Sequence, residues 1–248
     1  MSLRERVVEL TVGMGEKFLR ALDPYFARHS LVGDRAFFDP AQFPWLAELE
    51  AGVPAIQREL DALLADYDRL PNLQDISTEQ RIHTDDDRWK TLFFVGYGQP
   101  IGRVAERCPE TARLLRGVPG LTTAMFSMLS PNKRVPAHVG PYRGVLRFHL
   151  ALRIPAPASG CGIRVGSEVR HWEEGRTLVF DDVYDHEVWN DTDGVRVVLF
   201  MDVKRPLPAI PRLVNEAVIR MIRWSPFVQD AKLRQEAWER RTWSRSPG

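Results

Sequence analysis

The region between residues 89 and 206 carries a succession of short strand-like segments, and this feature restricts the fold more than any other. Each segment is rich in β-branched, aromatic or leucine residues, and Gly, Pro, Asn and Asp separate one from the next. The sequences at 131–133 and 190–194 contain residues that favour tight turns. At least six strands in about 110 residues, with no helical pattern between most of them, predict an antiparallel sandwich or jelly roll. The expected strands are 91–95, 122–129, 146–154, 162–165, 177–180 and 195–203.

Helical or irregular segments flank this β-rich region on both sides. Within 51–70, isoleucine and leucine recur at helical spacing. Residues 211–248 hold eight Arg or Lys against four Asp or Glu and also have a helical pattern. We therefore expect one domain with three parts. These are a helical or irregular flank over 1–88 that packs on the barrel, the central β-region over 89–206, and a basic helical segment over 207–248.

The composition is that of an ordinary globular protein. Across 248 residues the net charge is +1 and 44% of residues are hydrophobic, which is enough for a core. No interleaved aromatic and basic surface is evident, so we do not expect nucleic acid as a partner. The charged residues within 1–10 do not match a signal peptide, and no run of about 18 apolar residues predicts a membrane span. With only Cys108 and Cys161, which lack paired spacing, we expect reduced thiols and a cytoplasmic location.

The segment 146–152 separates its side chains into two chemical classes. The two-residue period of a strand puts Arg147 and His149 on one face and only leucine and phenylalanine on the other. Taken alone, this pattern favours a surface strand with its polar face in solvent.

Two histidines and an arginine in neighbouring segments favour a different interpretation. His138 lies upstream of this strand and His186 downstream, and neutral imidazole is a good ligand for Fe(II). Arg196 follows His186 by ten residues, at the start of an expected strand. An arginine that points into a barrel needs an anion. The dicarboxylate 2-oxoglutarate could supply it, because a guanidinium binds a carboxylate with two parallel hydrogen bonds.

Taken together, these segments resemble the aspartyl/asparaginyl β-hydroxylase family. The resemblance covers residues 89–206, and the combination of spaced motifs is more specific than any one of them. The motifs are His138-Val139-Gly140-Pro141, Arg147-Phe148-His149-Leu150, Arg170-His171-Trp172-Glu173-Glu174-Gly175, Phe180-Asp181-Asp182, His186-Glu187-Val188-Trp189-Asn190, Arg196 and Asp202.

The resemblance implies a mainly β, cupin-like fold, the double-stranded β-helix, with iron bound by His138 and His186. Many related oxygenases complete the iron site with a carboxylate two residues after the first histidine, but this position is Gly140 here, as it is in the family. Water would fill the vacant position. Asp182 is our candidate for the acidic residue that orients this water.

The resemblance also implies a site for the co-substrate. Arg196 would bind the distal carboxylate of 2-oxoglutarate with help from the Ser127 hydroxyl, while Arg147 and His149 would approach its C1 carboxylate. The expected activity is a dioxygenase reaction with Fe(II), 2-oxoglutarate and O2 that hydroxylates an unactivated C–H bond.

The substrate has two main interpretations. We expect the β-carbon of an aspartyl or asparaginyl residue or of a related amino-acid substrate, so that the partner is a peptide or a small molecule. The alternative is the acyl chain of a lipid of the lipid A or ornithine-lipid type, since the family includes such hydroxylases. The segment 211–224 bears on this choice, because it has an apolar stripe opposite charged residues. It would either pack on the barrel or make a peripheral membrane contact.

Two further alternatives keep the fold but change the chemistry. An iron halogenase would bind halide at the position that Gly140 leaves vacant. A non-catalytic binding module would have kept the barrel without turnover, and the retention of both histidines and Arg196 argues against it.

Overall fold

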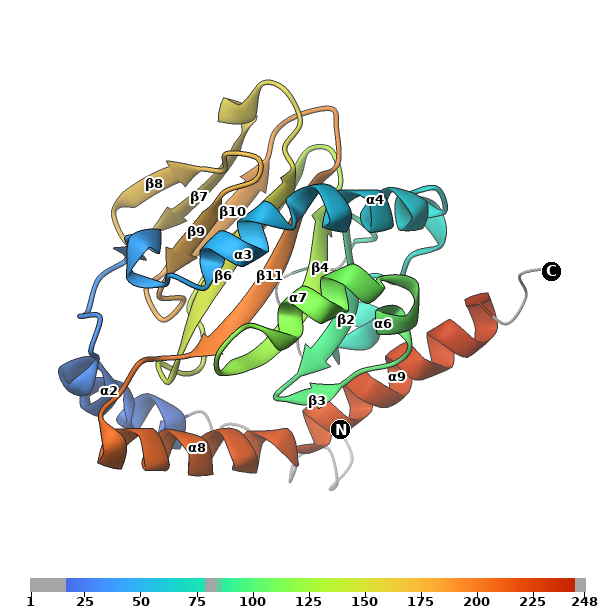
Figure 1. Cartoon of the computed structure of the whole chain (residues 1–248). Coiled ribbons are helices and arrows are strands. Elements are labelled where there is room, and N and C mark those ends of the chain that lie inside the picture. The colour runs from blue at the N-terminus through green and yellow to red at the C-terminus, as the bar shows by residue number, and fades with distance from the viewer. Residues whose placement is uncertain (1–16, 79–83, 85, 244–248) are drawn as a thin grey trace, which may run out of the picture.

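The computed structural model describes residues 17–78, 84 and 86–243, and the side chain of residue 227 is not described. The expectation drawn from the N-terminal residues 1–10 therefore lies outside the described residues. Strands make up the centre, and helices cover one side and the lower edge (Figure 1).

The strands form two antiparallel sheets of different size. The larger has the order β1-β9-β6-β11-β4-β2-β3 and the smaller has the order β5-β10-β7-β8. This arrangement confirms the double-stranded β-helix that the sequence predicts. The strands of the larger sheet are β1 (Phe37–Phe38), β9 (Thr177–Phe180), β6 (Val145–Arg153), β11 (Arg196–Lys204), β4 (Leu121–Leu129), β2 (Trp89–Gly96) and β3 (Gln99–Pro100). Those of the smaller sheet are β5 (Lys133–His138), β10 (His186–Asn190), β7 (Cys161–Val165) and β8 (Glu168–His171).

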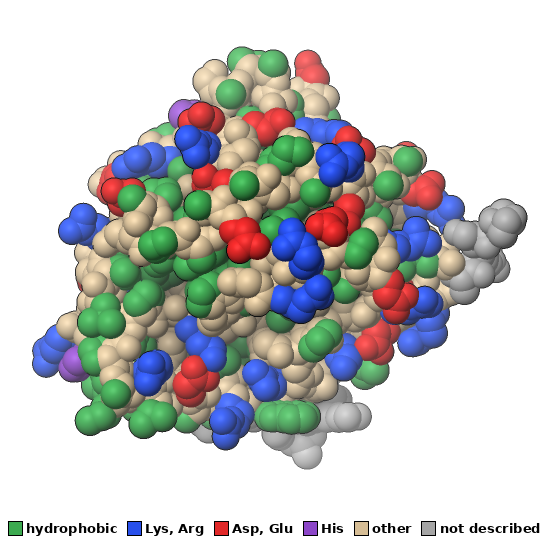
Figure 2. Space-filling view, in the orientation of Figure 1, with side chains coloured by type: hydrophobic (Ala, Val, Ile, Leu, Met, Phe, Trp, Pro, Cys, Tyr) green, Lys and Arg blue, Asp and Glu red, His purple; other side chains and the backbone are tan. Residues whose placement is uncertain are grey.

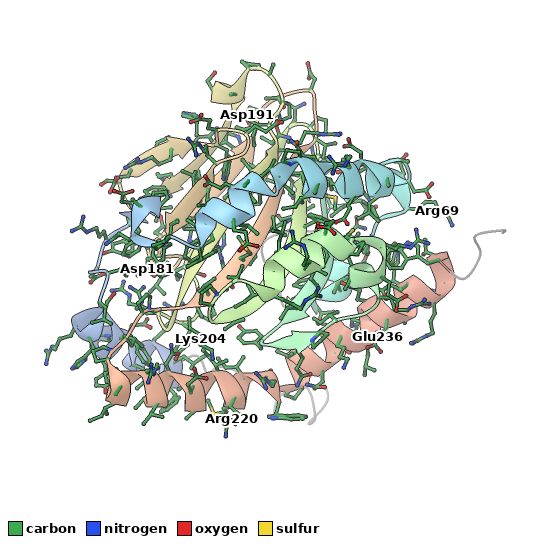
Figure 3. The ribbon with its side chains drawn as sticks, viewed as in Figure 1. Arg69, Asp181, Asp191, Lys204, Arg220 and Glu236 are labelled. Carbon is green, nitrogen blue, oxygen red and sulfur yellow. The ribbon has the colours of Figure 1, made fainter. Side chains whose placement is uncertain are left out.

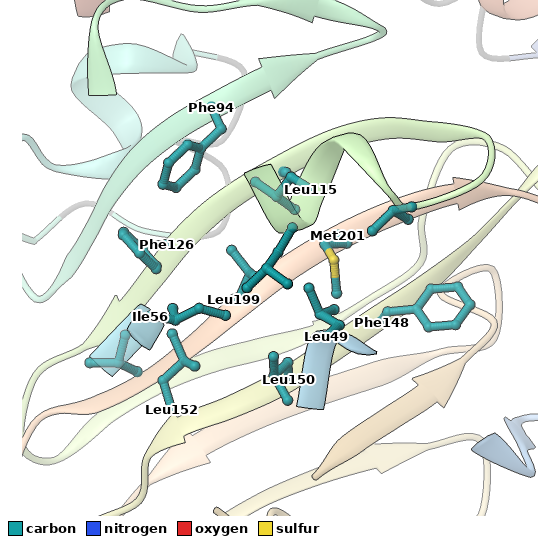
Figure 4. Packing of buried hydrophobic residues seen from close by; sticks show 14 of the residues in the cluster. Leu49, Ile56, Phe94, Leu115, Phe126, Phe148, Leu150, Leu152, Leu199 and Met201 are labelled. Carbon is teal, nitrogen blue, oxygen red and sulfur yellow. The ribbon is translucent and has the colours of Figure 1, made fainter. Parts of the chain in front are cut away.

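The two faces of the larger sheet bury two separate cores. Along β11, Leu199 and Met201 point to an outer core that the sheet shares with helices, while Val198 and Phe200 point to an inner core between the two sheets. The apolar face of β6 belongs to the outer core (Figure 4). The polar face of β6, with Arg147 and His149, is therefore turned towards the smaller sheet and not towards solvent.

Helices from the N-terminal part cover the outer core. Leu49 and Ile56 pack with Phe126 and Leu150 of the larger sheet (Figure 4). Among the residues described before β6 lie the helices α2 (Asp23–His29), α3 (Leu46–Ala51), α4 (Val53–Leu64), α5 (Leu73–Ile76), α6 (Val104–Arg107) and α7 (Pro109–Arg116).

Two long helices, α8 (Ala209–Arg223) and α9 (Pro226–Trp243), follow the last strand. Val218 and Ile219 of α8 pack with Phe26 of α2 in a third apolar cluster. On α9, Gln235 exchanges two hydrogen bonds of 2.8 Å with the backbone of Phe93 on β2. Within the part of the chain described, no helix is both long enough and apolar enough to cross a membrane.

Candidate active site

His138 and His186 come together across the smaller sheet. His138 is the last residue of β5, His186 is the first of β10, and the two are register partners in this antiparallel pair. Their ring centroids lie 4.1 Å apart. His186 is buried and His138 is partly exposed. Two imidazoles that are 48 positions apart in the sequence thus share one end of the sheet.

The backbone fixes the tautomer of both rings. The Nδ1 atom of His138 lies 2.8 Å from the Pro136 carbonyl oxygen, and that of His186 lies 3.0 Å from the Tyr184 carbonyl oxygen. A carbonyl oxygen can only accept, so both Nδ1 atoms carry a proton, and in a neutral imidazole the lone pair is then on Nε2. This is the form of histidine that binds a metal through Nε2, with the second nitrogen held by the protein.

A carboxylate from another segment fills the space beside Gly140. The Gly140 N–H donates to the backbone oxygen of Asp182 over 2.7 Å. A Cβ atom at position 140 would lie only 2.2 Å from Oδ2 of Asp182, which is itself buried. The side chain of Asp182 therefore stands where a carboxylate at position 140 would begin. Across the described residues, no three His, Cys, Asp or Glu side chains gather as a metal-binding group.

Arg147 holds this carboxylate in place. Its Nη2 lies 2.8 Å from Oδ2 of Asp182, while its Nε and Nη2 donate to the two oxygens of Asp202 over 2.9 and 3.1 Å. Asp202 is the register partner of Arg147 on β11. The sequence predicts that Arg147 approaches the co-substrate. In the structure its guanidinium pairs with two carboxylates of the protein, because the cross-strand register puts Asp202 directly beside it, and its expected contact with the co-substrate stays a prediction.

Arg196 has a very different environment. It is the first residue of β11 and is fully buried, yet its Nε and Nη1 atoms have no hydrogen-bond partner among the described residues. Its guanidinium carbon lies 4.7 Å from the centre of the Trp172 ring. Burial lowers the pKa of Arg196 to about 10. A buried guanidinium whose N–H groups lack acceptors is the arrangement that an anionic ligand would complete.

Further polar atoms without a hydrogen-bond partner lie next to Arg196. Both ring nitrogens of His149 and the indole nitrogen of Trp172 are buried without a partner in the described part of the chain. The two rings stack with centroids 5.9 Å apart. Burial lowers the pKa of His149 well below its usual range, and the charges of Arg196 and Arg147 lower it further, so the ring is neutral. Sequence reasoning assigned no role to Trp172, since no spacing distinguishes it from a packing residue.

Ser127 lies on β4 and is buried. Its hydroxyl oxygen accepts a hydrogen bond of 3.1 Å from the indole of Trp89, which leaves the hydroxyl hydrogen to be donated elsewhere.

The ring of Phe180 connects the donor group with the histidine pair. Its centroid lies 5.0 Å from that of His149 and 5.9 Å from that of His186. The structure thus brings the predicted iron ligands and the predicted co-substrate residues into one region of the inner core.

A second ion pair anchors the segment that carries Asp182. The neighbouring Asp181 is fully buried and pairs with the equally buried Arg205. Arg205 also donates to the backbone oxygen of Arg143 over 2.7 Å, and Asp181 lies near the α2 and α8 end of the sheets (Figure 3). The two consecutive carboxylates therefore have separate partners.

Comparisons with known proteins agree with this geometry. Residues 50–206 match the model of the family described as aspartyl/asparaginyl beta-hydroxylase. The chain is 44% identical over 214 residues to an ornithine lipid ester-linked acyl 2-hydroxylase of Rhizobium tropici, covering 86% of this chain and 76% of that protein. It is 31% identical over 189 residues to the human aspartyl/asparaginyl beta-hydroxylase, covering 67% of this chain and 24% of the human protein.

Among solved structures, the DMSP lyase DddQ from Ruegeria pomeroyi is similar with a TM-score of 0.33 and 14% identity, over 50% of each chain. Of the two substrate classes that the sequence suggests, the relatives support the lipid alternative better than the aspartyl/asparaginyl interpretation. The family model spans more than half of the chain, and the protein accordingly belongs to the aspartyl/asparaginyl β-hydroxylase family of hydroxylases.

Proposed function

We propose that the protein is an Fe(II)- and 2-oxoglutarate-dependent hydroxylase of lipid acyl chains. The observation that carries the proposal is the group of buried, unpaired donors on Arg196, His149 and Trp172 beside the paired histidines. The substrate class rests on the similarity to the acyl 2-hydroxylase of Rhizobium tropici, which extends over most of both chains.

The residues present fit an iron ion. His138 and His186 would bind it through Nε2, and a site with only two protein ligands leaves room for a co-substrate, water and oxygen. Oδ1 of Asp182 is buried without a partner in the described region, so this atom is suited to accept a hydrogen bond from a water on the metal. Imidazole and carboxylate donors favour a divalent transition metal of this kind.

The residues also fit 2-oxoglutarate. A buried guanidinium and a serine hydroxyl would bind the distal carboxylate, with Arg196 from β11 and Ser127 from β4. The neutral ring of His149 and the indole of Trp172 would each donate to the remaining oxygens. A halide in an iron halogenase would bind beside Gly140, but the Asp182 carboxylate fills this space and would repel a second anion, so the site favours hydroxylation over halogenation.

The residues of the chain would contribute to the reaction by holding and orienting the metal ligands and the co-substrate. When bound, the iron and 2-oxoglutarate supply the chemistry that inserts one atom of O2 into a C–H bond while the co-substrate loses CO2 and becomes succinate. The carbonyls of Pro136 and Tyr184 fix the histidine rings, and Arg147 fixes the Asp182 carboxylate. The apolar side chains of the inner core keep water from the reacting carbon.

The test is turnover with defined substrates. Iron-loaded protein with 2-oxoglutarate should form succinate and add 16 mass units to the acyl chain of an ornithine lipid, and should leave aspartyl and asparaginyl peptides unchanged. Hydroxylation of the peptide alone would overturn the lipid assignment. No succinate with either substrate would overturn the enzyme assignment.

Variants test the site residues separately. His138→Ala should lose iron binding, whereas Arg196→Met should keep iron and weaken 2-oxoglutarate at least about 100-fold, because two charge-assisted hydrogen bonds are lost. His171→Ala is the matched control. His171 makes the same type of Nδ1 contact, 2.9 Å to the Cys161 carbonyl oxygen, but lies on β8, and its loss should leave iron binding unchanged.

A further inference from the structure

Helix α8 has two apolar sides, and only one of them packs on the body. Pro211, Val218 and Ile219 are buried on the inward side. On the other side Ile210, Leu213, Met221 and the C-cap residue Trp224 are 72%, 67%, 53% and 69% exposed. The sequence predicts a single apolar stripe over 211–224, and the structure divides it into a packed part and an exposed part.

Helix geometry aligns the exposed residues. At about 100° per residue, the exposed residues and Ala217 fall within an arc of roughly 80°, and the centre of this arc lies roughly 150° from the centre of the packed side. We call this set the outer stripe. It consists of Ile210, Leu213, Ala217, Met221 and Trp224.

Arginines occupy the side of the helix between the outer stripe and the packed side, with Arg220 next to the stripe. Arg212 and Arg220 are exposed, and Arg223 is partly exposed while its Nε donates to the Tyr97 carbonyl oxygen over 2.8 Å. The one acidic residue of the helix, Glu216, is paired with Lys204 at 2.6 Å and so adds no net negative charge. Arg220 points away from the body at the lower edge (Figure 3), where hydrophobic and basic side chains lie close together with acidic atoms among them (Figure 2).

An anionic lipid surface is the partner that fits these features. Eight large hydrophobic side chains are exposed in the described part of the chain, and four of them lie on this one stripe. A contiguous apolar stripe on a surface marks an interaction site. The arginines beside it would repel a second copy of the same face, but would attract the phosphate groups of anionic lipids. We propose that α8 lies in the surface of an anionic bilayer, with the outer stripe among the acyl chains.

The packed side of α8 connects this surface with the active site. Asn215 donates to the Gly144 carbonyl oxygen over 2.7 Å and accepts a hydrogen bond from the Tyr142 hydroxyl. Both partners lie in the loop 139–144, which begins directly after His138. The helix on the bilayer would thus hold the loop beside the proposed iron ligands. The proposed membrane contact rests on the proposed function. A protein bound to the bilayer through α8 would have its active site close to the lipid substrate.

Vesicle flotation with the full chain tests the proposal. The protein should float with vesicles that contain phosphatidylglycerol and less with vesicles of phosphatidylcholine alone. Leu213→Gln/Met221→Gln should lower the partition coefficient at least about tenfold for each side chain lost. Leu233→Gln is the matched control, since Leu233 is 61% exposed on α9 but outside the stripe, and it should float like the unchanged protein.

Tryptophan fluorescence gives a second, independent measurement of membrane insertion. Trp224 should show a blue-shifted emission on adding anionic vesicles, and Trp224→Phe should remove that shift. Equal flotation of the stripe variant and the unchanged protein would overturn the proposal. A dimer without vesicles that the stripe variant abolishes would also overturn it, in favour of a second copy. Succinate formation on detergent-dispersed lipid should not depend on the stripe, so failure here is distinguishable from failure of the proposed function.

Discussion

Replacing Arg196 by methionine should stabilise the protein when no 2-oxoglutarate is present. Most substitutions of a buried arginine destabilise, because they remove hydrogen bonds. Here two nitrogens of the guanidinium have no partner among the described side chains and backbone groups, so the charge is buried at a cost that the protein does not recover.

The size of this cost follows from the pKa. Burial lowers the pKa of Arg196 from the ordinary arginine value to about 10, which corresponds to about 3 kcal/mol, since each pKa unit is worth about 1.36 kcal/mol. The cost is fully present below pH 10 and disappears as the pH rises from there towards the ordinary pKa of arginine. Loss of the contact with Trp172 offsets about 2 kcal/mol, because both groups are desolvated. The net gain at pH 7.5 is about 1 kcal/mol, or about 2–4 °C in melting temperature.

Thermal unfolding of the metal-free protein, followed by circular dichroism, measures this gain. Arg205→Met is the control, because Arg205 is equally buried but pairs with Asp181. Its loss should destabilise by about 3–5 kcal/mol, since a buried carboxylate is left without its partner. If Arg196→Met lowers the melting temperature as Arg205→Met does, then Arg196 has partners within the protein and the argument for an anion site fails.

Three further predictions concern single features of the site and its frame. Gly140→Ala should weaken iron binding in a metal titration, because the new Cβ would displace the Asp182 carboxylate, and unchanged affinity would mean that this carboxylate is not needed. Binding of 2-oxoglutarate, measured by calorimetry, should stay constant up to about pH 10 and then fall as Arg196 loses its proton, and a fall near pH 7 would point to another group. Asn190→Leu should destabilise by about 2–4 kcal/mol in urea unfolding, because its buried amide donates to three backbone oxygens, whereas a loss below about 1 kcal/mol would show that these bonds are not needed.

The strands that alternate clearly were predictable from the sequence. The expected strand over 146–154 corresponds to β6, and that over 195–203 corresponds to β11. Three strands of the smaller sheet were missed for physical reasons. β5 contains Pro136, which a sheet tolerates only at an edge, and β5 is an edge strand. β8 is exposed throughout, so it lacks the alternation of a half-buried strand. β10 alternates in burial, but two of its three buried residues are the polar His186 and Asn190, so its sequence does not show an apolar face.

The candidate site was predictable in its members but not in all of its pairings. The sequence placed His138 and His186 together because each belongs to a motif that resembles the family. It did not indicate that Arg147 would pair with Asp202, since that contact depends on the register between β6 and β11 across 55 positions. The roles of these residues in binding iron and co-substrate stay predictions until they are measured.

The separate anchoring of Asp181 and Asp182 has a consequence for how the protein acquires its metal. Small metal-binding domains depend on their ion to fold, and lose their shape when it is removed. Here, two arginines from neighbouring strands and loops already fix both acids, and backbone carbonyls already orient both imidazoles. Binding and release of the ion would then change the structure only locally, because the site is already folded without metal. Apoprotein prepared with a chelator should therefore bind metal again without refolding.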